Sequence, residues 1–350
     1  TPLILTNVRP WGGASVDITI EGSRIAAVHP AGSTVDEGTQ APVAGGHQLP
    51  TFEASPATRR DFHRHGTTAC RTHVDVDLGV GLRGIQTVRE AQARLDDAVA
   101  IEIVAFPQDG VIRRPGVLDL LDQAAAAGAT VIGGIDPATI DRDPVAQLDG
   151  LFEIAVRRDV GLDIHLHDRG ELGAFQYELI IDRTQRSGLG GRVTVSHGFA
   201  LGELTPERQQ TLLDGLGQAG ISWATVAPPG TAPLPWQAML DRGLKIGLGT
   251  DGIRDLWSPF GDGDLLRVAL GFARLHDLRT DAELTTAVEL ATTLAAPFVD
   301  RTQHDLRPGS RADIVLVDAE NVPDAIVRAP RRALVMSGGR IVARDGEVLV

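Results

Sequence analysis

The pattern of hydrophobic and polar residues divides the chain into two similar ends and a different middle. At both ends the two kinds of residue alternate with a period of two, which is typical of strands with one buried face. The alternating runs, separated by glycine-containing turns, lie at residues 3–8, 16–20, 24–28, 312–317, 332–336, 340–343 and 347–350. Because Gly22-Ser-Arg-Ile-Ala26 resembles Gly339-Arg-Ile-Val-Ala343, we predict one small β-sandwich domain built from residues 1–48 and 305–350. Two separate small β domains are the alternative.

The middle of the chain, residues 49–304, alternates short hydrophobic strands with amphipathic helices, which indicates parallel βαβ units. We predict strands at residues 69–74, 101–106, 130–135, 162–166, 193–196, 222–226 and 245–248. We predict helices at residues 86–100, 116–127, 144–158, 172–187, 206–219, 236–241 and 282–295, the last with a capping box of Thr280 and Glu283. The pattern therefore predicts an α/β fold, a (β/α)8 TIM-type barrel with the β-sandwich domain attached.

The strand count falls one short, since such a barrel needs eight strands. Residues 49–52 look like the start of a first strand, but residues 53–56 replace its continuation and leave no room for a helix before residues 57–65. We hypothesise that at least one βα unit, on the order of 30 residues, is missing between Phe52 and Glu53. A sequence that reads straight through this junction would contradict the hypothesis.

The amino-acid composition indicates which kinds of molecule the protein binds. The net charge of −13 argues against a nucleic-acid surface, which needs clustered Lys and Arg, and favours a small-molecule partner. The single cysteine, Cys70, excludes an intrachain disulfide and a cysteine-based zinc cluster. No run approaches the ~18 apolar residues of a membrane span, and the first residues given do not combine a basic segment with a following apolar one. We expect a cytoplasmic protein without a membrane partner, and homo-oligomerisation stays open.

Polar residues gather where the predicted parallel strands end. They are His73, Asp75, Asp77, Gln108, Asp136, His165, His167, Asp168, His197, Asp251, Asp255 and Trp257. One such residue alone is more often structural, but their recurrence at equivalent positions indicates an active site, which lies at this end of a barrel. Imidazoles from two strands and an aspartate from the last can hold a divalent metal with an open coordination position. His165 and His167 lie two apart, so both point to one face of their strand and both are candidate ligands.

These motifs, in this order, resemble the amidohydrolase superfamily, and within it cytosine deaminase and related heterocycle deaminases. The matching segments are Arg71-Thr-His-Val-Asp-Val76, Ile103-Val-Ala-Phe-Pro-Gln108, Val195-Ser-His197 and Gly249-Thr-Asp-Gly-Ile-Arg-Asp-Leu-Trp257, and the similarity covers nearly the whole chain. The resemblance implies one divalent metal ion, Zn²⁺ or Fe²⁺, with His165 and Asp251 as ligands. It also implies a hydrolase of C–N bonds other than peptide bonds.

The resemblance implies a role for each remaining residue. Asp251 accepts a proton from the attacking water, His197 stabilises the developing charge, and Asp168 shuttles the proton to the ring and the leaving group. Aspartate stands at 168 where cytosine deaminase has glutamate, so Glu171 is the alternative shuttle. Gln108 reads the amide-like edge of the ring, and the other predicted pocket residues are His73, His167 and Trp257.

Two further departures, besides the aspartate at 168, limit what the resemblance implies. The family's His-x-His pair on the first strand, which supplies two metal ligands, has no counterpart, and it belongs where the strand count fell short. His63 and His65 are instead interpreted as residues at a helix C-terminus, favoured there by the helix dipole. Gly252 stands where cytosine deaminase has a second aspartate beside the metal ligand, which indicates a larger or different substrate. Lys245 is the sole lysine and lies at the wrong strand end to bridge two metals, so a mononuclear site is expected.

The sequence therefore predicts a metal-dependent hydrolytic deaminase of a small nitrogen heterocycle, such as a cytosine-like pyrimidine, a purine or a triazine. One alternative is a hydrolase of a cyclic amide or an N-alkyl heterocycle, which the released product distinguishes from a deaminase. The other is a non-catalytic barrel homologue that acts as a binding or assembly protein, which metal analysis would distinguish.

Overall fold

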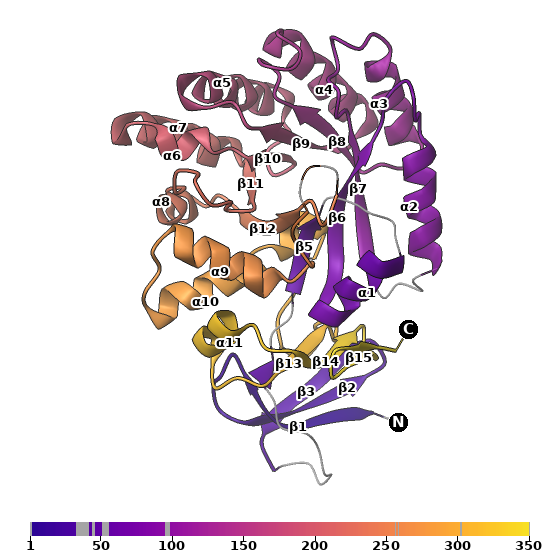
Figure 1. Cartoon of the computed structure of the whole chain (residues 1–350), viewed down its shortest axis with the longest axis vertical. Coiled ribbons are helices and arrows are strands. Elements are labelled where there is room, and N and C mark those ends of the chain that lie inside the picture. Colours follow the sequence, from indigo (N-terminus) through magenta and orange to yellow (C-terminus); the bar gives the residue numbers. More distant parts are fainter. Residues whose placement is uncertain are drawn as a thin grey trace. The chain divides into compact units, whose positions relative to one another are not determined.

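The computed structural model describes residues 2–32, 42–43, 46–50, 56–94, 99–255, 257, 259–301 and 303–349. The chain divides into two compact units. Their helices and strands are labelled in Figure 1. The first unit contains Thr1–Cys70, Gln92–Ile101 and Leu248–Val350, and the second contains Arg71–Ala91 and Glu102–Gly247. None of the described helices is both long enough and apolar enough to cross a membrane.

Strands from both ends of the chain share one eight-stranded sheet in the first unit. Its strands are β1 (Leu3–Pro10), β2 (Val16–Glu21), β3 (Arg24–Pro30), β4 (Pro42–Val43), β13 (Ile314–Val317), β14 (Arg332–Ser337), β15 (Arg340–Arg344) and β16 (Glu347–Val348). They follow the order β16-β15-β14-β13-β4-β1-β2-β3. The short β4 joins the two ends, since it pairs in parallel with β1 and antiparallel with β13. The predicted sandwich form and its limits, residues 1–48 and 305–350, stay predictions.

Strand β13 shows why this sheet needs hydrophobic residues on both faces. Ile314 and Leu316 point into a core cluster that contains Ile18 and Ile20 of β2. Val315 and Val317 point the other way, into a cluster that includes Ala325 of helix α11 (Val322–Arg328). A strand covered on both sides loses the alternation that exposed strands keep.

Three parallel strands also begin or end in the first unit. Strand β5 (Gly46–Pro50) pairs in parallel with β6 (Thr67–Asp75) and with β12 (Ile246–Asp251). Helix α1 (Pro56–His65) connects β5 to β6. The described parallel strands therefore number eight, rather than the seven predicted in full, because β5 is the additional strand and α1 serves as its helix. The junction between residues 52 and 53 lies outside the described residues, so the hypothesis of a missing segment stays a prediction.

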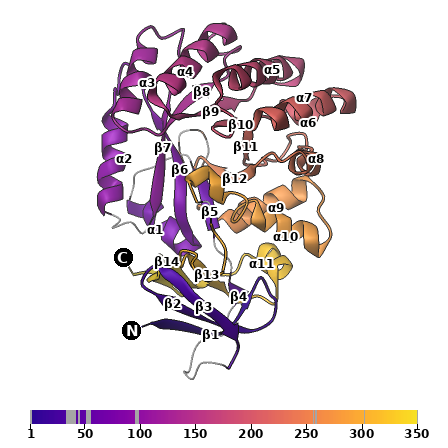
Figure 2. The ribbon, with the colours of Figure 1, turned by 180° about the vertical axis from the view of Figure 1, so that it is seen from behind.

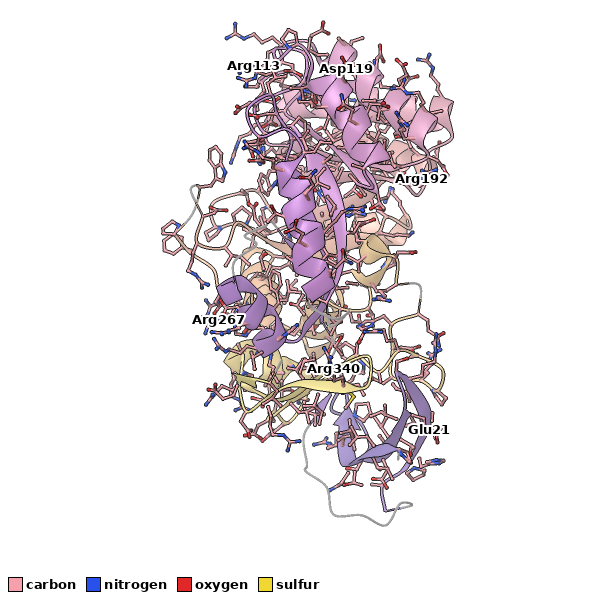
Figure 3. All side chains as sticks on the ribbon, turned by 90° about the vertical axis from the view of Figure 1, so that its right-hand side faces the viewer. Glu21, Arg113, Asp119, Arg192, Arg267 and Arg340 are labelled. Carbon is pink, nitrogen blue, oxygen red and sulfur yellow. The ribbon has the colours of Figure 1, made fainter. Side chains whose placement is uncertain are left out.

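The second unit is a run of parallel strands covered by helices (Figure 2). Its strands are β7 (Ala100–Phe106), β8 (Val131–Ile135), β9 (Gly161–Leu166), β10 (Val193–His197) and β11 (Ser222–Thr225). Its helices are α2 (Arg83–Arg94), α3 (Val117–Ala126), α4 (Pro144–Arg158), α5 (Gly170–Ser187), α6 (Ala200–Glu203), α7 (Pro206–Ala219) and α8 (Trp236–Asp241). Every residue of β10 is buried, while Arg113, Asp119 and Arg192 are exposed at the outside of the unit (Figure 3).

The remaining helices, α9 (Leu265–Leu275), α10 (Asp281–Glu289) and the 3₁₀ helix η1 (Ala296–Val299), belong to the first unit. The capping box predicted from Thr280 and Glu283 is confirmed at the start of α10. Along the parallel strands the order is β10-β11-β12-β5-β6-β7-β8-β9. The fold is thus mixed α/β, with a curved parallel sheet that alternates with helices, as predicted, and a second, largely antiparallel sheet.

Candidate active site

Four histidines converge at the carboxyl ends of the strands in the second unit. They are His73 on β6, His165 on β9, His197 at the end of β10, and His167 directly after β9. The Nε2 atoms of His165 and His73 lie 2.9 Å apart, and Nδ1 of His165 lies 3.2 Å from Nε2 of His197. The rings of His167 and His197 are 4.2 Å apart between centroids. The structure therefore brings together all four histidines predicted from the sequence.

Strand register explains this convergence. His165 pairs with Ile135 on one side and with Ser196 on the other, so the three strands end at the same level. At the end of β10 the backbone turns into the left-handed region, with φ 65° at His197 and φ 62° at Gly198. A Cβ atom at residue 198 would lie 2.0 Å from the Trp223 indole, which donates to the His197 carbonyl. Only glycine fits this turn, and the turn sets the place of His197.

A buried carboxylate, Asp163, lies beneath the histidines and was missed by the sequence analysis. It accepts hydrogen bonds from Arg71 Nη1 at 3.0 Å and from Ser196 Oγ at 2.5 Å. Burial opposes its ionisation, but the nearby His73 and Arg71 together hold the pKa of Asp163 below its ordinary value. Asp163 is two residues before His165 on the same strand, so the alternation that singled out the two histidines was the signal that could have found it.

His165 is an uncharged ligand candidate. Burial, and then the nearby His73 and His197, lower the pKa of His165 well below its ordinary value of 6.5. A neutral imidazole has a lone pair available for a metal ion. The structure gives His165 this state by removing its ring from water, since the side chain is 8% exposed.

The donor set fits a divalent metal ion. Two groups of side chains each place one ligand atom within 4.8 Å of the others: His165 with His167 and His197, and His73 with Asp163 and His165. With Zn–N bonds of about 2.0–2.1 Å in tetrahedral geometry, two ligating nitrogens lie roughly 3.3 Å apart. The separation of 2.9 Å between Nε2 of His165 and Nε2 of His73 and that of 3.2 Å between Nδ1 of His165 and Nε2 of His197 are each close to this value. They involve opposite nitrogens of the His165 ring, so one ion can use only one of the two pairs. Imidazole and carboxylate ligands suit zinc and iron.

Asp168 is held in place at the start of α5. It accepts hydrogen bonds from the Thr139 hydroxyl and from Gln176 Nε2, the latter at 2.9 Å. Glu171, the alternative proton shuttle, is 70% exposed and pairs with Arg208 of α7 at 3.2 Å. The two candidates therefore differ, because Thr139 on the loop after β8 and Gln176 of α5 hold Asp168 in place, whereas Glu171 is exposed.

Asp136, the residue that follows β8, fixes the loop between β9 and α5. It accepts hydrogen bonds from the backbone and ring of His167, the ring at 2.8 Å, and from the Asp168 backbone at 3.3 Å. Burial alone would raise the pKa of Asp136. The hydrogen bonds from His167 outweigh this effect, so the pKa of Asp136 lies below its ordinary value. A charged Asp136 thus orients His167, whose side chain is 44% exposed.

Gln108 lies half-buried on the loop after β7, as predicted. A second buried carboxylate, Asp141, anchors this loop by accepting the backbone N–H groups of residues 111, 112 and 113. Gln147 of α4 also donates to Asp141, at 2.7 Å. The contacts join the loops that follow β7 and β8. Their partners lie about 30 positions apart in the chain, and no local pattern in the sequence signals them.

Three predicted residues belong to the first unit. Asp251 ends β12 with its side chain exposed and a left-handed backbone, φ 56°. Trp257 is 78% exposed, and its backbone N–H donates to Asp255 at 2.8 Å. At Gly252 a Cβ atom would lie 2.0 Å from the Asp255 carboxylate, so glycine leaves room for Asp255. The roles of Asp251 and Trp257 stay predictions.

The interpretation of His63 and His65 as residues of a helix C-terminus is confirmed. Both lie in the last turn of α1. His63 is buried, and Nδ1 of His65 lies 3.6 Å from the carboxylate of Asp264.

The chain is similar to several known proteins. The model described as "Amidohydrolase family" matches residues 42–350. The chain is 31% identical to N-isopropylammelide isopropyl amidohydrolase of Pseudomonas sp. (strain ADP), over 82% of this chain and 71% of that protein. The crystal structure of N-isopropylammelide isopropylaminohydrolase from Burkholderia multivorans matches with 38% identity, full coverage of both chains and a TM-score of 0.93. A 5-methylcytosine deaminase from Klebsiella pneumoniae, in complex with 5-fluorocytosine, matches with 20% identity over 98% of this chain and 97% of its own, and a TM-score of 0.84.

Proposed function

Because this chain belongs to the amidohydrolase family, we propose that it is a metal-dependent hydrolase that cleaves the exocyclic C–N bond of a small nitrogen heterocycle. The coarser part of this statement, a hydrolase of C–N bonds other than peptide bonds, follows from the family and its relatives. The observation that carries the proposal is the convergence of His73, His165 and His197 at the strand ends.

The proposed metal site centres on His165, with Asp251 assigned to the same ion by the family resemblance. The buried, neutral state of His165 supports its assignment as a ligand. A single Zn²⁺ or Fe²⁺ ion, when bound, supplies Lewis-acid activation of water. The strand order supports closure of the parallel strands into a barrel, with Asp251 at the end of its last strand.

The chain's own residues are proposed to handle the protons. Asp251 accepts a proton from the attacking water, and Asp168 delivers a proton to the leaving nitrogen. We favour Asp168 over Glu171, because Thr139 and Gln176 fix Asp168, whereas Glu171 is exposed and paired with Arg208. His197 donates a hydrogen bond to the oxygen that gains negative charge.

Substrate recognition is proposed to rest on Gln108, whose carboxamide can pair with the amide-like edge of an oxo-heterocycle. His73, His167 and Trp257 complete the proposed pocket. Asp141 fixes the loop of Gln108 through three backbone hydrogen bonds. We expect this anchoring to matter for binding, because a carboxamide that recognises two ring atoms must be held in one orientation.

For the leaving group we favour an alkylamine, so the substrate is an N-alkylamino ring of the triazine or pyrimidine type. The 38% identity to an N-isopropylammelide isopropylaminohydrolase over both full chains supports this choice. The second candidate is a deaminase that releases ammonia. The likeness to the 5-methylcytosine deaminase, at 20% identity, shows the fold alone. The proposed compartment is the cytoplasm.

The test measures metal content and product together. The purified protein is analysed for zinc and iron, then supplied with pairs of hydroxylated aminotriazines and aminopyrimidines that differ only in an N-isopropyl group. We expect about one metal ion per chain and release of isopropylamine. His165→Asn should lose both metal and turnover, Asp251→Ala should lose turnover, and His29→Asn, a change of an exposed histidine on β3, should lose neither. Full turnover in Asp251→Ala, or in metal-free protein, would remove the proposal.

A further inference from the structure

A buried ionic network lies below the histidines in the second unit. Arg71 donates to Glu102 at 2.7 Å, to Asp163 at 3.0 Å and to the Thr194 hydroxyl at 3.1 Å. These residues come from β6, β7, β9 and β10, so one guanidinium joins four strands. The Arg71 side chain is 9% exposed and that of Asp163 is fully buried.

Strand alternation places this network one layer below the site. Residue 71 is two positions before His73, residue 163 is two before His165, and residue 194 is two before Ser196. Each pair therefore points to the same side of its strand. Arg71, Asp163 and Thr194 form the lower layer, and His73, His165 and Ser196 form the upper layer.

The carboxylate of Asp163 connects the two layers. Its Oδ2 atom accepts from Arg71 below and lies 3.7 Å from Nε2 of His73 above. Its Oδ1 atom accepts from Ser196 Oγ at 2.5 Å and lies 3.9 Å from Nε2 of His165. The hydrogen bonds from Arg71 and Ser196 fix both oxygens, so the face that the histidines meet is fixed as well.

Stability alone does not account for such a network. Removing charged groups from water costs about as much as their attraction returns, and hydrophobic residues of similar volume often stabilise a core equally well or better. What an ion pair adds is a defined position for each atom. Because the Asp163 carboxylate is fixed directly below the rings of His73 and His165, its position affects how those two rings are held.

We propose that the Arg71–Asp163 ion pair is a positioning device for the metal site, in which Asp163 orients the rings of His73 and His165 and thereby sets the affinity of the site for its ion. The proposal rests on the proposed function, since it takes the histidines as the metal site. Asp163 belongs to one of the two donor groups described above, but Arg71 and Ser196 donate to both of its oxygens. Arg71 and Asp163 are therefore assigned to positioning rather than to contact with substrate or metal. Ser196 is the third member, because its hydroxyl fixes the oxygen nearest His165.

The test measures Zn²⁺ affinity by competition with a chromophoric chelator, next to kcat and KM on the substrate found in the product screen. Asp163→Asn keeps the shape and removes the charge. We expect a 10- to 100-fold loss of Zn²⁺ affinity and of kcat, the range seen when partners of metal-binding histidines are removed, with KM within about twofold of the parent value. Ser196→Ala, which keeps the carboxylate, should shift both in the same direction by a smaller factor and serves if Asp163→Asn fails to fold.

Asp17→Asn is the matched control. Asp17 is a buried aspartate of β2 that accepts backbone hydrogen bonds from Asn7 at 2.8 Å and Gly32 at 3.1 Å. This variant should keep both Zn²⁺ affinity and kcat. Parent-like Zn²⁺ affinity in folded Asp163→Asn and Ser196→Ala, with a loss in His165→Asn, would overturn this inference alone. Parent-like affinity in His165→Asn would instead overturn the proposed function.

Discussion

A buried ion pair in the first unit gives a sharp prediction about stability. Asp264, the N-cap of α9, pairs with Arg332 at the start of β14, and the two side chains are 2% and 4% exposed. The carboxylate also accepts the Leu266 backbone N–H at 3.0 Å. The guanidinium donates to the carbonyl oxygens of Pro330, at 2.8 Å, and His65, at 3.3 Å.

The loss of stability in each variant depends on which buried charge remains without its partner. Asp264→Ala removes the cap, which costs about 1 kcal/mol, and leaves a buried guanidinium without its anion, which costs about 3–5 kcal/mol. Arg332→Met leaves a buried carboxylate and costs about 3–5 kcal/mol for the same reason. In the double variant no charge remains uncompensated, so the two losses should overlap by about 2–3 kcal/mol.

The assay is urea unfolding of the parent, both single variants and the double variant, followed by tryptophan fluorescence and circular dichroism. The control cycle uses Asp324 and Arg328, an i,i+4 pair on α11 whose Nη2–Oδ2 distance is 2.6 Å but whose side chains are 27% and 48% exposed. Solvent screens that pair, so its cycle should show only the small coupling that is usual for exposed i,i+4 pairs, well below that of the buried pair. Additive losses for Asp264→Ala and Arg332→Met would refute the reasoning, since they would mean that neither charge depends on the other.

Four further predictions concern the site and the backbone. Asp168→Asn should lower kcat by about 10²–10⁴-fold, the usual contribution of a proton-transfer group, with little change in KM, measured by amine release. Gln108→Ala should chiefly raise KM. Asp141→Ala should also raise KM, with kcat less affected, because loss of the Asp141 carboxylate frees the loop that carries Gln108. An unchanged KM in both variants would contradict the proposed recognition. Gly198→Ala should be strongly destabilising, because its Cβ would lie 2.0 Å from the Trp223 indole. Gly271→Ala within α9 should instead raise stability by up to about 1 kcal/mol in thermal unfolding, because none of the described residues outside the helix backbone comes within 4 Å of the added Cβ. Chelator treatment should abolish turnover and added Zn²⁺ or Fe²⁺ should restore it.

Local patterns predicted much of the fold because parallel strands covered on both faces are continuous hydrophobic runs. The runs at residues 101–106 and 162–166 correspond to β7 (Ala100–Phe106) and β9 (Gly161–Leu166). Strand β5 was only half recognised, since Gly46–Pro50 includes His47 and Gln48 and lacks such a run. One of its two partners, β12, is distant in the sequence, since Gly249 pairs with Leu49. Tertiary pairing, which no local pattern carries, defines that strand.

The same division holds for the site. His165 and His167 were found from their spacing on one strand, and the resemblance to a family supplied roles for residues on other strands. Asp163 was missed because a charged residue inside a hydrophobic strand is stable only with a partner, and that partner, Arg71, lies 92 positions away. The Asp141 anchor was missed for a similar reason, since its bonds go to backbone N–H groups that every residue type except proline offers.

The short strand β4 has a consequence for how the protein is made. Val43 of β4 pairs with Leu316 of β13, about 270 residues later in the chain. At ribosomal rates of about 5–20 residues per second, the early strands wait roughly 15–55 seconds for their partners to be synthesised. During this interval the edge of β4 that will pair with β13 is unpaired, and the early strands have an uncovered face that includes Ile18 and Ile20. The nascent chain should therefore depend on a chaperone at this stage, and more so when translation is slowed.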